Sequence, residues 1–312
     1  MSVFFVLLGK ILPLYANIVL GYLASRYLRV NKEAIATVLF YVVGPMVVFS
    51  ATLSVTINPA VLFLPVFFYL LGSLLAFIHL KLFEKTWPDA TSNILGFTAG
   101  TGNSGYYGIA LALVLFEPAI ADIFIFTVLA SFFYEATTGF YITAKGTFTA
   151  LESFKKVCRL PTVYAFLAAL VLNLTGIGLP ESITAYAGQF KVVFSILGMM
   201  VIGMGLDGMR KGGGVDVTFL KISLTAKHLL WPTLVCLVIL LDTTFTHLLY
   251  GELYKVMFVF SIVPMAGNTV TLAVLLNAKP EKAALAVLLS NLLSIVYVPV
   301  MLAIYAYVSG LF

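Results

Sequence analysis

The sequence predicts an all-α polytopic membrane protein, and its composition, the spacing of its apolar segments and an internal repeat each support this fold class. Of the 312 residues, 62% are hydrophobic and only 10% are charged, and the mean hydropathy is +1.08. A soluble domain carries about 25% charged residues, so a soluble fold is excluded. The net charge of +5 comes from basic residues in short loops rather than from an extended patch, and we expect no nucleic-acid partner.

Ten apolar segments are long enough to cross a bilayer as helices, since a helical span needs about 20 largely apolar residues. Residues 1–24 lack a basic start and a small-residue cleavage site, so we expect them to be a retained first span rather than a signal peptide. The predicted spans are residues 3–24, 34–54, 60–83, 92–116, 118–143, 161–178, 183–206, 218–241, 252–277 and 282–309.

The distribution of Lys and Arg predicts the orientation of these spans, because cytoplasmic loops carry an excess of both residues. Fourteen of them lie in or beside loops that follow odd-numbered spans, and two lie in loops that follow even-numbered spans. We therefore expect both termini outside the cytoplasm. The longest connection, residues 144–160, is expected on the cytoplasmic side.

An internal repeat divides the chain into residues 1–143 and 161–312, with 144–160 as linker. "VVGPMVV" (42–48) resembles "ILGMMVI" (196–202), "GNS" (102–104) resembles "GNT" (267–269), and "VLAS" (128–131) resembles "VLLS" (287–290). Because five spans is an odd number, the second copy enters the membrane from the opposite side. Inverted repeats place substrate sites near the bilayer midplane, where interrupted helices meet.

Spans four and nine are predicted to be interrupted. Gly100, Gly102 and Gly105 weaken a helix in the first, and Pro264 and Gly267 do so in the second. The glycine spacing also matches a dinucleotide-binding fingerprint, but the strand, turn and helix that this motif requires are missing. Close packing of ordinary membrane helices is the alternative interpretation.

An interrupted helix offers binding groups at membrane depth. Freed N–H groups attract anions, whereas freed carbonyl groups attract cations. The side chains of Asn103 and Asn268 can both donate and accept hydrogen bonds. Nearby hydroxyl groups belong to Thr101, Ser104, Thr269 and Thr271.

Glu135 is the outstanding ionisable residue inside a predicted span, and such residues are usually functional. Ser131 and Thr138 share its helix face, four residues before and three after. Glu135 is expected to bind a cation, to carry a coupling proton or to pair with a basic group, and these interpretations stay open.

The chain resembles the auxin efflux carrier family, which includes plant auxin exporters and bacterial carriers of malonate and other small organic anions. The resemblance covers nearly the whole chain and is carried by "LGKILPLYANIVLGYLASRYLRVNKEAIATVLFYVVGPMVVFSATL" (8–53), "LPTVYAFLAALVLNLTGIGLPESI" (160–183), "AKHLLWPTLV" (226–235) and "VPMAGNTVTLAVLLNAKPEKAALAVLLSNLLSIVYVPV" (263–300).

The resemblance implies the fold of bile acid–sodium symporters and sodium–proton antiporters, in which broken spans four and nine cross. A transport domain of spans 3–5 and 8–10 would move against a scaffold of spans 1, 2, 6 and 7, which often dimerises. The crossover residues carried over are Gly102, Asn103, Ser104, Pro264, Gly267 and Asn268. Two departures stand out, because span four has no crossover proline and "SIVPMAG" (261–267) has no sodium-binding carboxylate.

These observations lead us to expect a secondary transporter of a small organic anion, a carboxylate above all, in a bacterial inner membrane. The anion would lie at the crossover, among Thr101, Gly102, Asn103, Ser104, Pro264, Gly267, Asn268 and Thr269. Glu135 and Ser131 would support coupling, by a proton or by a sodium ion at Ser104, Ser131 and Glu135.

We expect lipid and a second copy of the chain as partners, and no cofactor beyond the coupling ion. The alternatives are a sodium-coupled symporter of a bile-acid-like anion and a membrane receptor that does not transport. No catalytic motif lies at membrane depth, so an enzyme is not expected.

Overall fold

The computed structural model describes residues 3–144, 160–207, 215–276 and 278–309, and these residues are entirely α- and π-helical apart from their connections. Most of the predicted linker, residues 145–159, lies outside the described residues, as do Arg210 and Lys211. Seven helical stretches are long and apolar enough to cross a membrane: Phe5–Leu28, Lys32–Ser54, Pro59–Phe83, Pro118–Thr143, Glu181–Gly205, Val217–Thr246 and Pro280–Val308. The predicted class of all-α polytopic membrane protein is confirmed at this level.

The first half of the chain holds twelve described elements. They are α1 (Val3–Leu28), α2 (Lys32–Val38), the π-helical turn η1 (Leu39–Val43), α3 (Gly44–Ser54), α4 (Pro59–Phe83), α5 (Ala90–Gly100), η2 (Ser104–Gly108), α6 (Ile109–Leu115), α7 (Pro118–Thr127), α8 (Leu129–Tyr134), η3 (Glu135–Gly139) and α9 (Phe140–Thr143).

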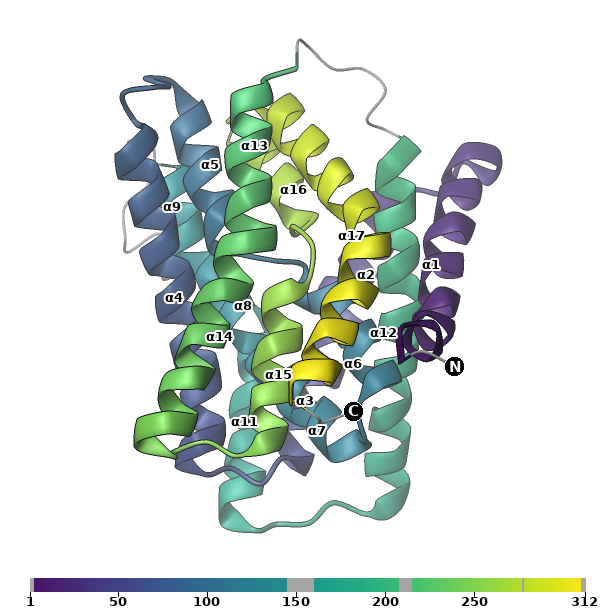
Figure 1. Cartoon of the computed structure of the whole chain (residues 1–312). Coiled ribbons are helices and arrows are strands. Elements are labelled where there is room, and N and C mark those ends of the chain that lie inside the picture. The colour runs from purple at the N-terminus through teal and green to yellow at the C-terminus, as the bar shows by residue number, and fades with distance from the viewer. Residues whose placement is uncertain (1–2, 145–159, 208–214, 277, 310–312) are drawn as a thin grey trace.

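The second half holds nine described elements. They are α11 (Pro161–Thr175), α12 (Glu181–Asp207), α13 (Val217–Thr225), η5 (Ala226–Leu230), α14 (Trp231–Leu241), η6 (Asp242–Thr246), α15 (Gly251–Ile262), α16 (Asn268–Leu275) and α17 (Pro280–Ser309). In Figure 1, α15 and α16 follow one another near the middle of the molecule with a loop between them.

Local sequence accounts for where these helices begin and end. The side chains of Asn31, Asn58 and Asp89 each accept a hydrogen bond from a backbone N–H of the first helical turn. The predicted sixth span ends earlier than expected, because Gly176 takes a left-handed conformation with φ of 69° directly after α11. At 15 residues α11 is therefore shorter than an ordinary membrane-spanning helix.

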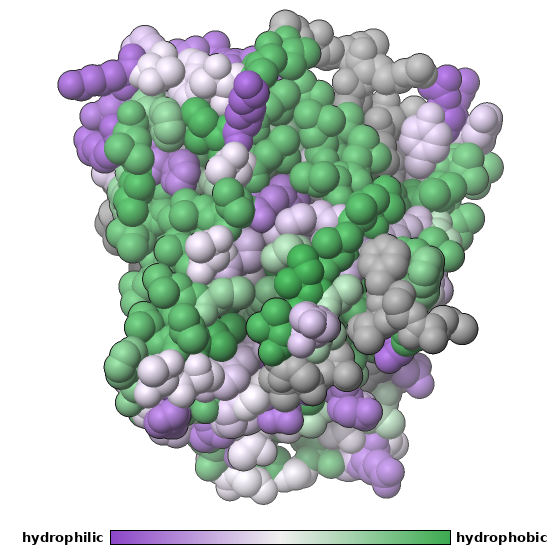
Figure 2. Space-filling view, in the orientation of Figure 1, coloured by the Kyte–Doolittle hydropathy of each residue, from purple (hydrophilic) through white to green (hydrophobic). Residues whose placement is uncertain are grey.

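The surface has the layering of a membrane protein. Figure 2 shows apolar side chains over the middle of the visible face, while hydrophilic side chains gather toward its upper and lower ends. Many large apolar residues are well exposed, among them Phe5, Leu74 and Val296. Exposed apolar area on this scale suits contact with lipid tails rather than water.

The two predicted interruptions are present. Helix α5 ends at Gly100 and the chain is extended to Asn103, and α15 ends at Ile262 with irregular backbone as far as Gly267. Because these stretches divide their spans into short helices, spans four and nine are absent from the seven long membrane-spanning stretches.

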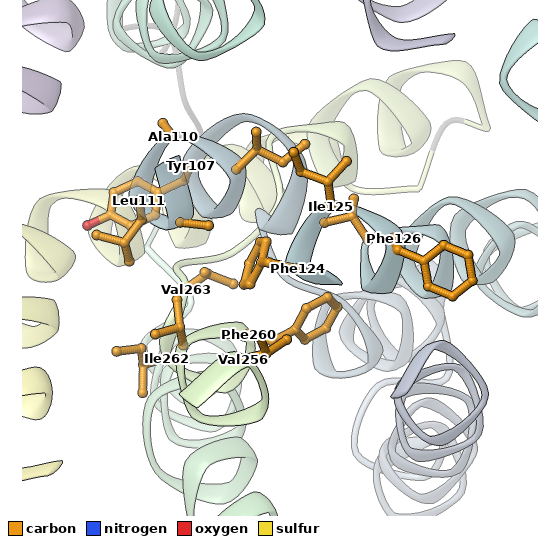
Figure 3. Packing of buried hydrophobic residues seen from close by; sticks show 14 of the residues in the cluster. Tyr107, Ala110, Leu111, Phe124, Ile125, Phe126, Val256, Phe260, Ile262 and Val263 are labelled. Carbon is orange, nitrogen blue, oxygen red and sulfur yellow. The ribbon is translucent and has the colours of Figure 1, made fainter. Parts of the chain in front are cut away.

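An aromatic core fixes the helices on one side of the interruptions. Figure 3 shows Phe124 of α7 beside Phe260, in the last turn of α15, and Val263, directly after this helix. The rings of Phe124 and Phe260 lie 5.8 Å apart between centroids, and Phe68 of α4 stacks on Phe260 at 4.1 Å. Buried aromatic pairs of this kind hold α4, α7 and α15 in fixed relation.

Polar contacts tie together the ends of three other helices. The Lys282 ammonium of α17 donates to the Thr91 hydroxyl of α5 at 3.0 Å and to the carboxylate of Asp216, which caps α13, at 2.8 Å. Burial alone would raise the pKa of Asp216, but the Lys282 ammonium and the Phe219 N–H together lower it. The Lys282 ammonium therefore joins α17 to α13 by an ion pair and to α5 by a hydrogen bond, at one end of the bundle.

Candidate functional site

The two interruptions touch, and Asn103 joins them. Its backbone N–H donates to the carbonyl oxygen of Pro264 at 2.7 Å. Its side-chain Oδ1 accepts from the Tyr107 N–H at 3.3 Å, which caps the start of η2. The other end of the same amide, Nδ2, is buried and has no hydrogen-bond partner among the described residues. Asn103 thus presents a donor that the fold leaves unsatisfied.

Four half-helix ends meet around this contact, and their partial charges differ in sign. The N-termini of η2 and α16 carry partial positive charge, whereas the C-termini of α5 and α15 carry partial negative charge. A negative group is therefore stabilised beside Asn103 or Asn268, and a positive group beside Gly100 or Ile262.

Glu135 lies at one of the positive ends. The Asn268 side-chain Nδ2 donates to its Oε2 at 2.9 Å, and the Thr101 hydroxyl donates to its Oε1 at 3.4 Å. The Ser104 hydroxyl donates to the Ser131 hydroxyl at 2.7 Å in the same region. The structure therefore brings together five residues that the sequence selected separately, from both halves of the chain.

Two cavities meet at the crossover. The Glu135 cavity, of about 30 Å³, is lined by Glu135, Ser131, Ser104, Gly102 and apolar residues of η1, α3, α8 and α12. The Lys32 cavity, of about 80 Å³, is lined by Lys32, Thr271, Asn291 and apolar residues of α12, α16 and α17. Both are lined by Asn103, Tyr106, Gly267 and Asn268.

Their sizes suit different occupants. A water occupies about 10–15 Å³ on this measure, so the Glu135 cavity holds roughly two or three water molecules or one ion. The Lys32 cavity holds roughly five to eight heavy atoms on the same basis, which is the size of a small organic acid.

Not every residue selected from the sequence faces these cavities. Thr269 is fully buried, its hydroxyl has no partner among the described residues, and it lines neither cavity. Thr271, two residues further along α16, lines the Lys32 cavity instead. Pro264 contributes its backbone carbonyl rather than its ring.

Lys227 is the charged residue that the sequence reasoning missed. It lies in η5 with 1% of its surface exposed, and its ammonium is 4.5 Å from the centre of the Trp231 ring. A Cβ atom on Gly102 would lie 2.4 Å from this ammonium, so the two residues are in direct contact. Its position inside predicted span eight was the available signal, because ionisable residues there are usually functional.

The surroundings of Lys227 suit a cation but contain no acid partner. Within the part of the chain that the structure describes, no hydrogen bond or ion pair is formed by its ammonium, which lies near the negative end of α5. The Trp231 indole N–H donates to the Ala99 carbonyl at 2.8 Å and so holds the aromatic ring against this end. Lys227 therefore adds positive charge behind Gly102 without lining either cavity.

Lys227→Met is expected to weaken binding of an anion at Asn103 by roughly 5- to 1,000-fold, since a unit charge about 4 Å away contributes about 1 kcal/mol in bulk water and about 4 kcal/mol near a protein surface. The fold should persist, because an apolar side chain of similar length replaces an unpaired buried charge. Ligand-induced thermal shifts measure the effect, and Lys221→Met, an exposed lysine of the same span, is the control. Unchanged affinity in Lys227→Met would contradict this role.

His228 links the second interruption to α17. Its Nε2 lies 2.8 Å from the Ser290 hydroxyl, which also accepts a hydrogen bond from the Met265 N–H at 2.8 Å. The Tyr297 hydroxyl donates to the His228 carbonyl at 2.6 Å. Ser290 thus holds the irregular backbone before Gly267, as Ser131 holds Ser104 in the first half.

Metal ligands of the usual kinds do not gather anywhere in the described ranges, where no group of three His, Cys, Asp or Glu side chains could hold an ion. The expected sodium set of Ser104, Ser131 and Glu135 lines one cavity. Its two hydroxyl groups bond to each other, and both carboxylate oxygens already accept from Asn268 and Thr101.

No protein-family model matches the chain, and no curated protein matches it significantly. Seven helical stretches among the described residues are long and apolar enough to cross a membrane, and they indicate the class of protein. The chain is an integral membrane protein.

Proposed function

We propose that the chain is a secondary transporter of a small organic anion, with a carboxylate bound where the two interrupted segments touch. The observation that carries this proposal is the unsatisfied amide of Asn103, which lies between two cavities and beside two positive helix ends. A buried donor without a partner is costly unless a ligand supplies an acceptor.

The formal charges around the crossover favour an anion over a cation. Lys32 lines one cavity and Lys227 lies against Gly102, whereas Glu135 is the acidic residue that lines the other cavity. Glu135 is already held by two donors, so its charge is partly balanced. The remaining field is positive and attracts a carboxylate.

Inverted repeats and an elevator-like motion belong to the same proposal. The interruptions occupy corresponding places in the two halves, and Ser131 and Ser290 each form a hydrogen bond to the interruption of their own half. Under this proposal ten crossings form a transport domain of spans 3–5 and 8–10 and a dimerising scaffold of spans 1, 2, 6 and 7. These features agree with the resemblance to auxin efflux carriers.

Tyr106 lies where the proposed domains meet. It lines both cavities and packs against Phe194 of α12, with ring centroids 5.4 Å apart. A Cβ atom on Gly198 would lie 2.9 Å from the Tyr106 ring, so the glycine leaves room for it. A shift of the transport domain would move Tyr106 along α12 and alter access to the two cavities.

A ligand screen followed by a flux measurement tests the proposal. Purified protein is expected to gain thermal stability with acetate, lactate or malonate, by about 2.7 kcal/mol at a ligand concentration 100 times Kd. Asn103→Leu should lose this gain, and Asn93→Leu, which removes a half-buried amide bonded to the Ile142 carbonyl, should keep it. Binding without uptake into liposomes would instead indicate a receptor.

The sodium-coupled alternative is tested in the same assay. Ser104, Ser131 and Glu135 line one cavity and supply oxygen atoms, which is the observation in its favour. If replacing sodium with choline abolishes binding and uptake, the carrier is coupled to sodium rather than to a proton. Indifference to sodium supports coupling by a proton or uncoupled transport.

A further inference from the structure

We propose that the Lys32 cavity selects anions that also carry a hydrogen-bond donor, such as hydroxy acids, and that the side-chain oxygen of Asn291 accepts the hydrogen bond from this donor. The inference rests on the proposed function and names the substrate class of the same site. Lys32 and Asn103 offer donors for the carboxylate, and Asn291 offers an acceptor for the second group.

The side chain of Asn291 is held in one orientation. Its Nδ2 donates to the Val287 carbonyl of the same helix at 2.8 Å, and rotating the amide would place two oxygen atoms together. Its Oδ1 is buried and finds no donor among the residues that the structure describes. Asn291 itself is 5% exposed.

An unpaired buried oxygen of this kind has an energetic meaning. Leaving it unsatisfied costs about 1–3 kcal/mol, so a ligand that supplies a donor recovers this amount. Because Asn291 lines the larger cavity, a ligand bound there would lie beside this side chain. A binding site built to pair a polar group rejects analogues that lack that group.

Lys32 supplies the charge at the same cavity. It is the first residue of α2, directly after the capping residue Asn31, and its ammonium lies against Gly205 of α12. No hydrogen bond or ion pair holds this ammonium within the described ranges. The neighbouring wall is largely apolar, with Ala36, Ile202 and Leu288 among its residues, so the charge is weakly screened.

These groups together define the ligand chemistry. A carboxylate fits the two donors, Lys32 and Asn103, while a hydroxyl or ammonium group fits Asn291. A simple alkyl acid would leave the Asn291 oxygen unpaired, and a second carboxylate would place another oxygen against it. A donor-bearing acid of about six heavy atoms satisfies the charge, the acceptor and the cavity size.

Lactate and isobutyrate form the decisive ligand pair, because a methyl group replaces the hydroxyl at nearly constant shape. Full-length wild-type protein is expected to bind lactate at least about tenfold more tightly than isobutyrate. Asn291→Leu should bring the two affinities within about twofold, mainly by weakening lactate. Titration followed by thermal shift measures both, with Asn291→Ala as a second variant should the leucine variant not fold.

Two control variants separate selectivity from charge. Lys32→Met is expected to weaken both acids equally, and Asn93→Leu should change neither affinity nor their ratio. Equal affinities in the wild type would mean that water satisfies Asn291, and would overturn this inference while the carrier proposal stands. A ratio unchanged in Asn291→Leu would overturn it as well. Failure of every acid to bind would overturn the carrier proposal too.

Discussion

Glu135→Gln is expected to abolish accumulation driven by a pH gradient while leaving the fold intact. Glutamine keeps an oxygen that accepts from Asn268, and its amide group can donate to the Thr101 hydroxyl, so both hydrogen bonds have a replacement. The exchangeable proton is lost, because an amide does not titrate. If Glu135 carries the coupling proton, gradient-driven uptake should fall at least about tenfold, and exchange of anion without a gradient should persist.

The measurement uses liposomes with an imposed pH difference, and compares accumulation with exchange. Glu117→Gln is the matched control, since this glutamate is exposed and precedes α7. Equal pH dependence in Glu135→Gln and the wild type would show that the carboxyl group is not the proton carrier. Glu135→Leu tests the structural role, because it leaves the Asn268 amide unpaired at a cost of about 1–3 kcal/mol.

The sequence predicted the interruptions because their cause is local. Glycine and proline disfavour a helix wherever they stand, so Gly100, Gly102 and Pro264 indicated the breaks without knowledge of neighbours. Glu135 was identified for a similar reason, since its depth in an apolar span is visible in one sequence. Each of these features can be explained by the roughly ten residues of chain around it.

Tertiary contacts explain what the sequence could not supply. Nothing local places the Asn103 N–H on the Pro264 carbonyl, or the Lys227 ammonium against Gly102. In the sequence, Lys32 was only one of the basic loop residues that predict the orientation of the spans, whereas the structure places it on a cavity wall. Thr269 was selected for its hydroxyl group, yet the direction in which α16 begins turns it away from both cavities.

Helices α1 and α12 pack very closely, beside the wall of the Lys32 cavity. A Cβ atom on Gly203 would lie 1.9 Å from the Ile18 carbonyl oxygen, and one on Gly21 would lie 2.0 Å from the Met200 carbonyl oxygen. The two backbones are therefore in direct contact, as small residues permit in membrane helices. Both helices belong to the proposed scaffold, which should remain rigid while the transport domain moves.

Gly203→Ala is expected to destabilise the protein by about 3 kcal/mol, the upper end of the usual cost of overpacking, because the clash is with backbone that cannot rotate away. Restoring ordinary contact would require α1 and α12 to separate by more than an ångström. Thermal unfolding of purified protein measures the loss, and Gly188→Ala in the same helix is the control, since its added Cβ meets nothing within 4 Å. The control should be neutral or stabilising by up to about 1 kcal/mol, from improved helix propensity.

The same substitution should also weaken anion binding. Val201, Ile202 and Gly205 flank Gly203 on α12 and line the Lys32 cavity, so separation of the helices changes the wall against which Lys32 lies. We expect residual folded Gly203→Ala to bind lactate less tightly than Gly188→Ala does. Equal stability of the two variants would show that α1 and α12 can move apart at little cost, which a rigid scaffold does not allow.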